Sequence, residues 1–313
     1  MRIVRYSEER KGEWDAFVKK AKNSLFMFQR DYMDYHSDRF ADHSLLFYEE
    51  DEMLAVLPAN EAEGVLYSHQ GLTFGGLLLG TEIRQYRVLE CMEQLCAYLR
   101  EGGFTRLIYK CVPHMYHSQP AEEDRYALFR CGGRLTEVTA STVVKLADPC
   151  KRTKGRKAQI SRARREGVNV RLLESAEDYR RFMALEDGVL EARHNTHAVH
   201  SPEELWLLHS RFPGEIRLYG GFYEEKLVAG CVLFCYPGLV HTQYMAADDT
   251  ARQLGALDLV IDTIAAEYTG SAAWLDFGIS TEEGGRILNE GLIAQKESFG
   301  GRTNVYEKWE LVP

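Results

Sequence analysis

The chain lacks the features that mark membrane-spanning proteins and proteins that coat nucleic acids. No stretch of its 313 residues approaches the roughly 18 consecutive apolar residues of a membrane helix, so no transmembrane segment is predicted. Positive charge is also scarce, because 38 lysines and arginines face 47 acidic residues, leaving a net charge of −9. That balance argues against DNA as a partner. Residues 1–7 lack the apolar core of a signal peptide, so a cytoplasmic location is expected.

Cysteine spacing typical of disulfide frameworks is missing as well. The seven cysteines form no C-x-x-C pair, and an odd number suits reduced thiols better than disulfides. Cys231 and Cys235 stand four residues apart in a strand-like run, so they share a face of that strand. Core packing is the favoured interpretation of this pair and metal ligation the alternative. No metal site is predicted.

What the chain does contain is one order of elements that appears twice. The length suggests two domains, which we place at residues 1–150 and 151–313, with Asp148-Pro149 between them. In the first half, hydrophobic periodicity predicts strands at 3–6, 44–48, 53–59, 65–68, 73–79, 106–111 and 134–146, and helices at 8–21, 30–39, 83–100 and 122–130. In the second half it predicts strands at 168–173, 216–223, 227–235, 239–246, 273–277 and 304–311, and helices at 176–192, 202–211, 257–268 and 285–298. The predicted fold class is α/β (α+β), with two tandem domains that each hold a mixed, mostly antiparallel sheet flanked by helices.

The most basic window of this acidic chain is residues 151–165. One interpretation is a stripe that faces tRNA or another phosphate-bearing molecule, since lysine and arginine bind phosphate. The other is a solvated amphipathic helix with Ala158, Ile160 and Ala163 turned inward. We favour the second, because few aromatic residues are interleaved with the charges.

The order of elements in the second half resembles that of GNAT acyltransferases. The segment Trp274-Leu275-Asp276-Phe277-Gly278, then Asn289-Glu290-Gly291-Leu292 and the run from Gln295 to Gly301, resembles Fem-type peptidoglycan-bridge transferases and their relatives among bacterial acyltransferases. Trp14, Phe28-Gln29 and the stretch from Lys157 to Val168 fit the same family. The resemblance implies two GNAT-like domains, an acceptor held in the cleft between them, and a last strand that crosses back to complete the first domain.

The resemblance also implies the reaction. An acyl or aminoacyl group passes from acyl-CoA or aminoacyl-tRNA to an amine by direct attack, with no tightly bound cofactor; the absence of a G-x-S-x-G motif agrees with this. The acceptor is a small molecule or a cell-wall or polysaccharide precursor, and tRNA is one candidate donor carrier. The alternative is a catalytically inactive GNAT-like pair that binds a sugar-phosphate or a protein partner.

Four residues are candidates for the chemistry. Tyr244 is a candidate general acid for the leaving group, and His241 or Asp276 a candidate base. Strict strand alternation would place His241, Gln243 and Met245 on one face and Thr242 and Tyr244 on the other. Lys296 matches a family lysine that precedes a Phe-x-Gly turn, and a lysine there suits a donor phosphate or carbonyl oxygen.

The donor is expected at residues 247–256, a loop that feeds a helix. The family signature is Q/R-x-x-G-x-G/A, and here Arg252, Gly255 and Ala256 supply R-x-x-G-A. Met245 and Ala246 end the preceding strand and complete the predicted donor-binding set. Asp248 and Asp249 would repel a phosphate, and a helix entry without a ligand is the alternative.

Two polar segments are candidates for holding the acceptor. Arg193, His194 and His197 resemble an acceptor-side loop of the family, in which basic groups hold an acidic or phosphorylated acceptor. The H-x-x-H spacing also admits zinc, but the sequence pairs no third ligand with it. His69 lies in the glycine-rich segment 67–76, which the family comparison turns toward the cleft, whereas a plain strand–turn–strand is the alternative.

Overall fold

The computed structural model describes residues 1–194 and 196–313, with the side chains of 192–194 outside the description. The chain divides into two compact units. The first comprises Met1–Thr139, Thr281–Ile287 and Val305–Pro313, and the second comprises Ala140–Ser280 and Leu288–Asn304. These units begin and end at residues other than 150. The domain boundary after residue 150 therefore stays a prediction.

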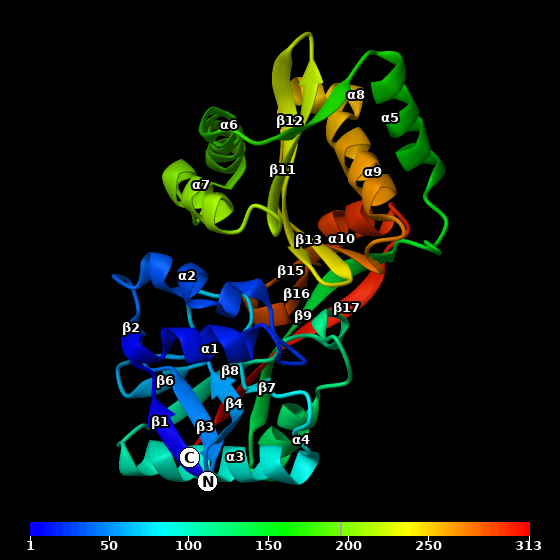
Figure 1. Cartoon of the computed structure of the whole chain (residues 1–313). Coiled ribbons are helices and arrows are strands. Elements are labelled where there is room, and N and C mark those ends of the chain that lie inside the picture. Colours follow the sequence, from blue (N-terminus) through cyan, green and yellow to red (C-terminus); the bar gives the residue numbers. More distant parts are fainter. Residues whose placement is uncertain (195) are drawn as a thin grey trace. The chain divides into compact units, whose positions relative to one another are not determined.

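The first unit holds a four-stranded sheet and one end of an eleven-stranded sheet, and its strands β9, β16 and β17 continue into the second unit (Figure 1). Its strands are β1 (Arg2–Arg5), β2 (Ala41–Asp42), β3 (Leu45–Glu49), β4 (Glu52–Leu57), β5 (Asn60–Ala62), β6 (Val65–Tyr67), β7 (Leu78–Leu79), β8 (Arg106–Lys110) and the first part of β9 (Arg134–Lys145). Its helices are α1 (Lys11–Val18), α2 (Arg30–Met33), α3 (Gln85–Glu101) and α4 (Glu123–Arg130). One sheet has the order β1-β3-β4-β7 and is antiparallel. In the other, β17 (Arg302–Leu311) pairs antiparallel with β8, and β8 pairs parallel with β6.

The core of the first unit forms on α3. Its apolar residues recur at three- and four-residue spacing, and Val88, Met92, Leu95 and Leu99 are all 0% exposed. The helix expected at 30–39 is shorter than predicted, since α2 ends at Met33. The strand expected at 73–79 is reduced to β7, because Gly75 and Gly76 approach Ser68 and Tyr109 too closely for a side chain and bend the segment into a loop.

The second unit has one sheet with helices on both faces. Its strands are the end of β9, β10 (Asn169–Leu173), β11 (Ile216–Tyr223), β12 (Lys226–Tyr236), β13 (Leu239–Ala247), β14 (Trp274–Ile279) and the start of β17. The short pair β15 (Thr281–Glu282) and β16 (Ile287–Leu288) forms a separate sheet that belongs to the first unit except for Leu288. The helices of the second unit are α5 (Lys154–Arg165), α6 (Ala176–His194), α7 (Pro202–Arg211), α8 (Asp249–Leu254), α9 (Ala256–Tyr268) and α10 (Glu290–Glu297). The strands run in the order β10-β11-β12-β13-β14-β9, antiparallel except for the parallel pair β13 and β14.

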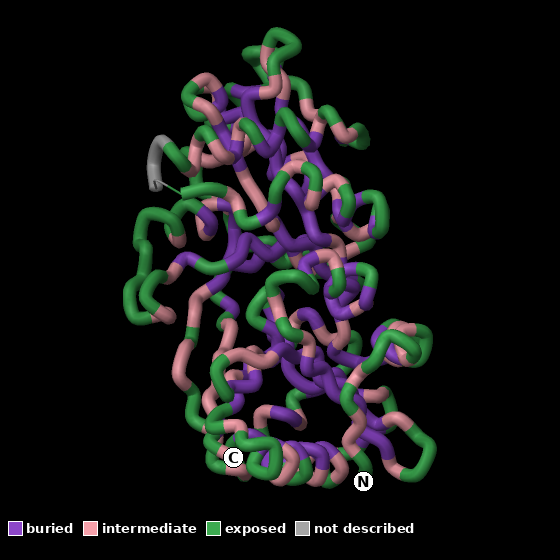
Figure 2. Tube along the Cα trace, turned by 90° about the vertical axis from the view of Figure 1, so that its left-hand side faces the viewer, coloured by how far each residue is buried: buried purple, intermediate pink, exposed green. Residues whose placement is uncertain are grey.

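Helices α6 and α7 lie on one face of this sheet and α9 on the other, with α5 packed along α9 (Figure 1). Buried residues follow the central strands and the inner side of these helices (Figure 2). A core cluster of the unit lies on the α9 face and includes Cys231, Leu233, Val260 and Ile264. Cys231 is thus part of the apolar core, and all seven cysteines are free thiols.

The basic window forms α5, which is capped by the Thr153 hydroxyl. Ile160 and Ala163 are buried as predicted, whereas Ala158 is exposed, which corrects the expectation that it packs inward. Arg152 and Arg164 both pair with Asp262 of α9, so part of the positive charge holds the two helices together.

Candidate functional site

The site begins where two parallel strands of the second unit part. β13 and β14 pair only from Leu239↔Trp274 to His241↔Asp276 in the described part of the chain. Past this point β13 stays paired with β12, and β14 with β9. The two central strands therefore splay, and their backbone groups beyond His241 and Asp276 face an opening in the sheet.

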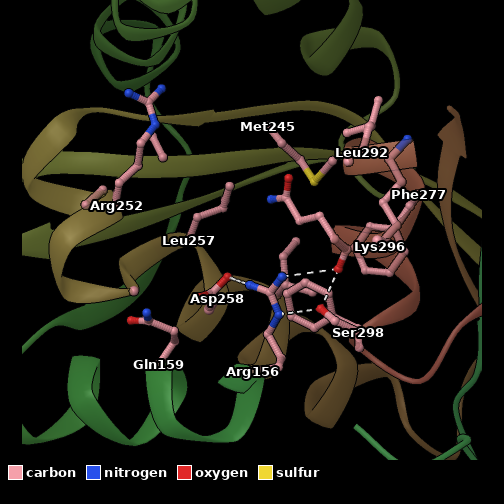
Figure 3. A pocket seen from close by; sticks show the side chains of 18 of the residues that line it. Arg156, Gln159, Met245, Arg252, Leu257, Asp258, Phe277, Leu292, Lys296 and Ser298 are labelled. Atoms are coloured by element: carbon pink, nitrogen blue, oxygen red, sulfur yellow. Dashed lines mark hydrogen bonds and ion pairs between the residues drawn. The ribbon is translucent and has the colours of Figure 1, made fainter. Parts of the chain in front are cut away.

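A cavity of about 830 Å³ occupies the second unit beside this opening (Figure 3). Its wall comes from α5, α6, β13, α8, α9, β14 and α10. The apolar part includes Val189, Leu190, Met245, Leu257, Ile261, Phe277 and Leu292, and the polar part includes Arg156, Gln159, Glu186, Arg252, Asp258, Gln295, Lys296 and Ser298. A largely apolar cavity with a few charged groups is typical of a small-molecule or cofactor site.

Lys296 of α10 is the one predicted catalytic residue in the cavity wall. Its side chain is nearly buried, and its Nζ donates hydrogen bonds to the carbonyl oxygens of Gly278 (3.0 Å) and Ile279 (2.7 Å) at the end of β14. Burial lowers the pKa of Lys296 to about 8, although the Asp276 carboxylate opposes that shift. The residue thus presents an ammonium group, at neutral pH, at the point where the strands part.

His241 and Asp276 form a pair at the last paired position of the splay. His241 Nδ1 lies 3.3 Å from Asp276 Oδ2. Asp276 is 0% exposed, and its Oδ1 accepts hydrogen bonds from the Ser141 hydroxyl and from the Gly278 N–H. The carboxylate therefore fixes the imidazole and ties β14 to β9. Neither residue belongs to the cavity wall.

A β-bulge in β13 changes which residues share a face. The register passes from Tyr244↔Val232 to Thr242↔Leu233, so Gln243 is the extra residue. As a result His241 and Tyr244 lie on the same face, toward α6, and Thr242 and Met245 lie on the other. This corrects the expected alternation, which had set His241 and Tyr244 on opposite faces.

Tyr244 reaches away from the cavity wall toward His200. Its hydroxyl lies 2.6 Å from His200 Nδ1. Burial raises the pKa of Tyr244 to about 12, so at neutral pH the hydroxyl keeps its proton. Tyr244 remains a candidate proton donor, and its hydroxyl is hydrogen-bonded to His200.

The predicted donor loop is largely helical. Residues 249–254 form α8, and the Asp248 carboxylate caps it by accepting a hydrogen bond from the Ala251 N–H (2.8 Å). Capping turns that carboxylate toward its own helix. Arg252 and Gly255 line the cavity with Met245, whereas Ala246 and Ala256 are buried outside its wall.

Helix α5 packs directly on the start of α9. Gly255 has φ +77°, and a Cβ there would lie 2.7 Å from the Gln159 carbonyl oxygen. One turn earlier, Arg156 pairs with Asp258, donates to the Ser298 hydroxyl (2.8 Å) and lies 4.0 Å over the Phe299 ring. These contacts join α5, α9 and the end of α10 around one end of the cavity (Figure 3).

Replacing Gly255 by alanine should destabilise the protein. The left-handed φ and the overlap with Gln159 together are expected to lower the free energy of unfolding by about 2 kcal/mol. Urea denaturation measures this loss. Gly214→Ala is the matched control, because nothing lies within 4 Å of that Cβ, and we expect a change below about 0.5 kcal/mol. Equal stability of the two variants would contradict the close packing of α5.

Glu186 of α6 is a residue of the site that our sequence analysis missed as a candidate. It lines the cavity, is 7% exposed, and its Oε2 has no hydrogen-bond partner in the described residues. Burial raises the pKa of Glu186 to about 7, and the neighbouring Asp187 adds to the shift. A signal was available: Tyr179, Phe182 and Met183 define a buried helix face, and Glu186 continues it.

Two of the predicted acceptor residues, His69 and His197, are not in the wall of this cavity. His69 belongs to the first unit and is 3% exposed, with φ +67° and a ring stacked 5.3 Å from that of His36. Burial lowers the pKa of His69 to about 3, which keeps it neutral. His197 is exposed, with Nδ1 3.9 Å from Asp187 Oδ1, and the side chains of Arg193 and His194 lie outside the described residues.

Two classes of feature were also searched for in the described ranges 1–194 and 196–313. Across them, no group of three or more His, Cys, Asp or Glu side chains is placed to hold a metal ion. No helix there combines the length and apolar character needed to cross a membrane.

Comparison with known proteins identifies the fold. Residues 151–283 match the family model described as an acetyltransferase (GNAT) domain. Apart from its last three residues, the matched segment lies in the second unit, and it includes the splay between β13 and β14. No curated protein sequence matches the chain.

Solved structures extend the likeness to the whole chain. The crystal structure of FemX is similar with a TM-score of 0.69 and 10% identity, covering 100% of this chain and 98% of that chain. L-PGS from Bacillus licheniformis is similar with a TM-score of 0.65 and 13% identity, covering 98% and 91%. A tandem GNAT protein from the clavulanic acid biosynthesis pathway reaches 0.51 and 13%, covering 99% and 98%. The chain thus shares its fold with these structures, and the predicted fold class is confirmed.

Proposed function

We propose that this protein transfers an acyl or aminoacyl group from an activated donor to a primary amine in the cavity of its second unit. The observation that carries the proposal is the cavity beside the splayed strands, with the Lys296 ammonium in its wall. The GNAT match over residues 151–283 supports acyl transfer as the reaction class.

In this reaction the amine nitrogen attacks the carbonyl carbon of the donor. The C–N bond forms, the bond to the donor's sulfur or oxygen breaks, and the proton lost by nitrogen balances the one that the leaving group gains. Lys296 is placed to stabilise the negative charge that develops on the carbonyl oxygen. Asp276 and His241 hold β13 and β14 at the splay, and the apolar wall around Met245 and Leu257 suits a flexible donor arm.

The donor is an acyl-CoA or an aminoacyl-tRNA, and the structure offers features toward both. Arg252, near the start of α9, is a basic side chain suited to the phosphate of either donor, and it pairs with the exposed Asp249 at 2.8 Å. The basic α5 adds Lys154, Lys157 and Arg162, which are exposed and suited to phosphate along a longer chain. The acceptor we propose is a small molecule or precursor that bears a primary amine.

The test is donor binding by the wild-type chain and by a variant with a filled cavity. We expect the wild type to be retained on immobilised coenzyme A or to shift charged tRNA in a gel. Leu257→Trp replaces a leucine of the cavity wall by a larger indole ring that fills part of the cavity, and it should weaken donor binding about tenfold or more. Leu207→Trp is the control, because Leu207 is 40% exposed on α7 and outside the cavity wall. Binding of neither donor, or equal binding by both variants, would refute the proposal.

A further inference from the structure

We infer that Glu186 is the binding site for the acceptor's ammonium group and takes the proton that this group gives up before attack. The role of Glu186 as proton acceptor rests on the proposed function, because it requires a transfer reaction. The binding of an ammonium group stands on the cavity alone. Neither role follows from the residues that the sequence motifs singled out.

The first argument is the position of the carboxyl. α6 packs against β12 and β13 through a buried face that includes Tyr179, Phe182 and Met183. Phe182 lies so close to Gly230 of β12 that a Cβ there would be 2.6 Å from the ring. Glu186 is on the same face one turn further along, where the wall of the cavity begins. The backbone therefore carries this carboxyl into an interior position, where it is costly without a partner.

The second argument is the charge in the cavity wall. Arg156 is already paired with Asp258, Lys296 is held by two backbone carbonyls, and Arg252 is paired with Asp249. Glu186 has no ion pair in the described part of the chain, and its Oε2 has no hydrogen-bond donor. The Glu186 carboxylate would thus be stabilised by a bound cationic group that donates hydrogen bonds to it.

The groups that face Glu186 from its neighbours do not supply that cation. The nearby titratable groups are Asp187 on α6, Cys231 on β12, Tyr244 on β13 and, beyond Tyr244, His200. Asp187 is engaged with the Ala198 N–H at 2.9 Å, and the Tyr244 hydroxyl with His200. Each of the first three is acidic or neutral at pH 7, so a bound ammonium would be the group that balances the carboxylate.

The chemistry follows from an acid that ionises near neutrality. A primary ammonium ion beside Glu186 favours the carboxylate and forms a charge-assisted hydrogen bond with it. Transfer of one proton from nitrogen to the carboxylate gives a neutral amine and a carboxylic acid. The lone pair of the amine then attacks the donor carbonyl, and the proton on Glu186 returns to solvent after the product leaves. A buried carboxyl with a pKa close to 7 is well matched to that exchange.

The experiment measures amine binding without any donor. n-Butylammonium is the probe and n-butanol the uncharged control ligand, both followed by ligand-observed NMR on the full chain. We expect the amine to bind and the alcohol not to compete with it. Glu186→Gln should weaken amine binding at least tenfold and still fold, because it removes a buried charge, and thermal unfolding checks this. Asp187→Asn should bind as the wild type does. Unchanged binding by Glu186→Gln, or equal binding of butanol, would overturn the site.

A second arm distinguishes the acceptor's amine from the amino group of an aminoacyl donor. With an acetyl donor, which has no amino group, Glu186→Gln should lower the rate at least tenfold and remove the acidic limb of the pH–rate profile near pH 7. A loss confined to aminoacyl donors would overturn the assignment to the acceptor. The two proposals can fail separately. If the wild-type chain binds neither coenzyme A nor charged tRNA, the proposed transfer reaction is refuted. If Glu186→Gln binds the amine as well as the wild type does, only the Glu186 site is refuted.

Discussion

Replacing Lys296 by methionine should lower kcat/KM for acyl transfer by about 10²- to 10³-fold, since it removes the cation that we propose stabilises the developing oxyanion. Methionine keeps the length and apolar stem of lysine, so the wall of the cavity stays filled. The effect should fall mainly on kcat, because charge on the carbonyl oxygen grows in the transition state. Steady-state kinetics with whichever donor binds measures it.

The pH dependence of the wild-type activity should also reflect the charge of Lys296. Burial lowers the pKa of Lys296 to about 8, so its ammonium form is lost as pH rises through that value. Activity should therefore fall above about pH 8, and the Lys296→Met variant should lack this alkaline limb. Lys157→Met is the matched control, since Lys157 is exposed on α5 and outside the cavity wall. An unchanged kcat/KM in Lys296→Met would remove Lys296 from the mechanism.

Replacing Asp276 by asparagine should be the most destabilising change at the site. The carboxylate is 0% exposed and accepts from Ser141 and Gly278 while it faces His241. The asparagine oxygen can still accept from Ser141 and Gly278, but an amide nitrogen replaces Oδ2 beside His241, so the buried imidazole loses its carboxylate partner. We expect the free energy of unfolding to fall by about 3 kcal/mol.

Urea denaturation followed by fluorescence measures the Asp276→Asn effect. Asp51→Asn is the control, because Asp51 is exposed in the turn between β3 and β4, and a change below about 0.5 kcal/mol is expected there. A similar small change in Asp276→Asn would show that the network around β14 does not hold the splay. Activity of the refolded variant then separates the structural role of Asp276 from its role in orienting His241.

Much of the fold could be predicted from the sequence because hydrophobic periodicity is local. The helix predicted at 83–100 is α3, and the three consecutive strands β11, β12 and β13 were predicted to within a few residues. The same logic failed at residues 30–39 and 73–79, where glycine contacts and short turns override the local pattern. The α8 helix was missed because six residues carry too little periodicity.

The site was harder to predict because it depends on register and on contacts between distant residues. The bulge at Gln243 reverses which residues of β13 share a face, and no local pattern in Val240–Met245 marks it. The partner of Tyr244 is His200, which lies in the loop before α7, and strand alternation alone cannot predict that contact. Glu186 could have been predicted from the sequence. It continues the buried face of its helix, and an acidic residue is rarely buried without a partner or a functional role.

The two units share strands, and this has a consequence during synthesis on the ribosome. In the first unit, β8 pairs with β17, and Leu107 and Leu311 of that pair are both 0% exposed. The whole second unit is translated between these two strands. A nascent chain that has just completed β8 therefore holds an apolar strand edge without its neighbour, which is a hazard for misassembly. The N-terminal unit, although it emerges first, cannot complete its sheet until β17 has been synthesised.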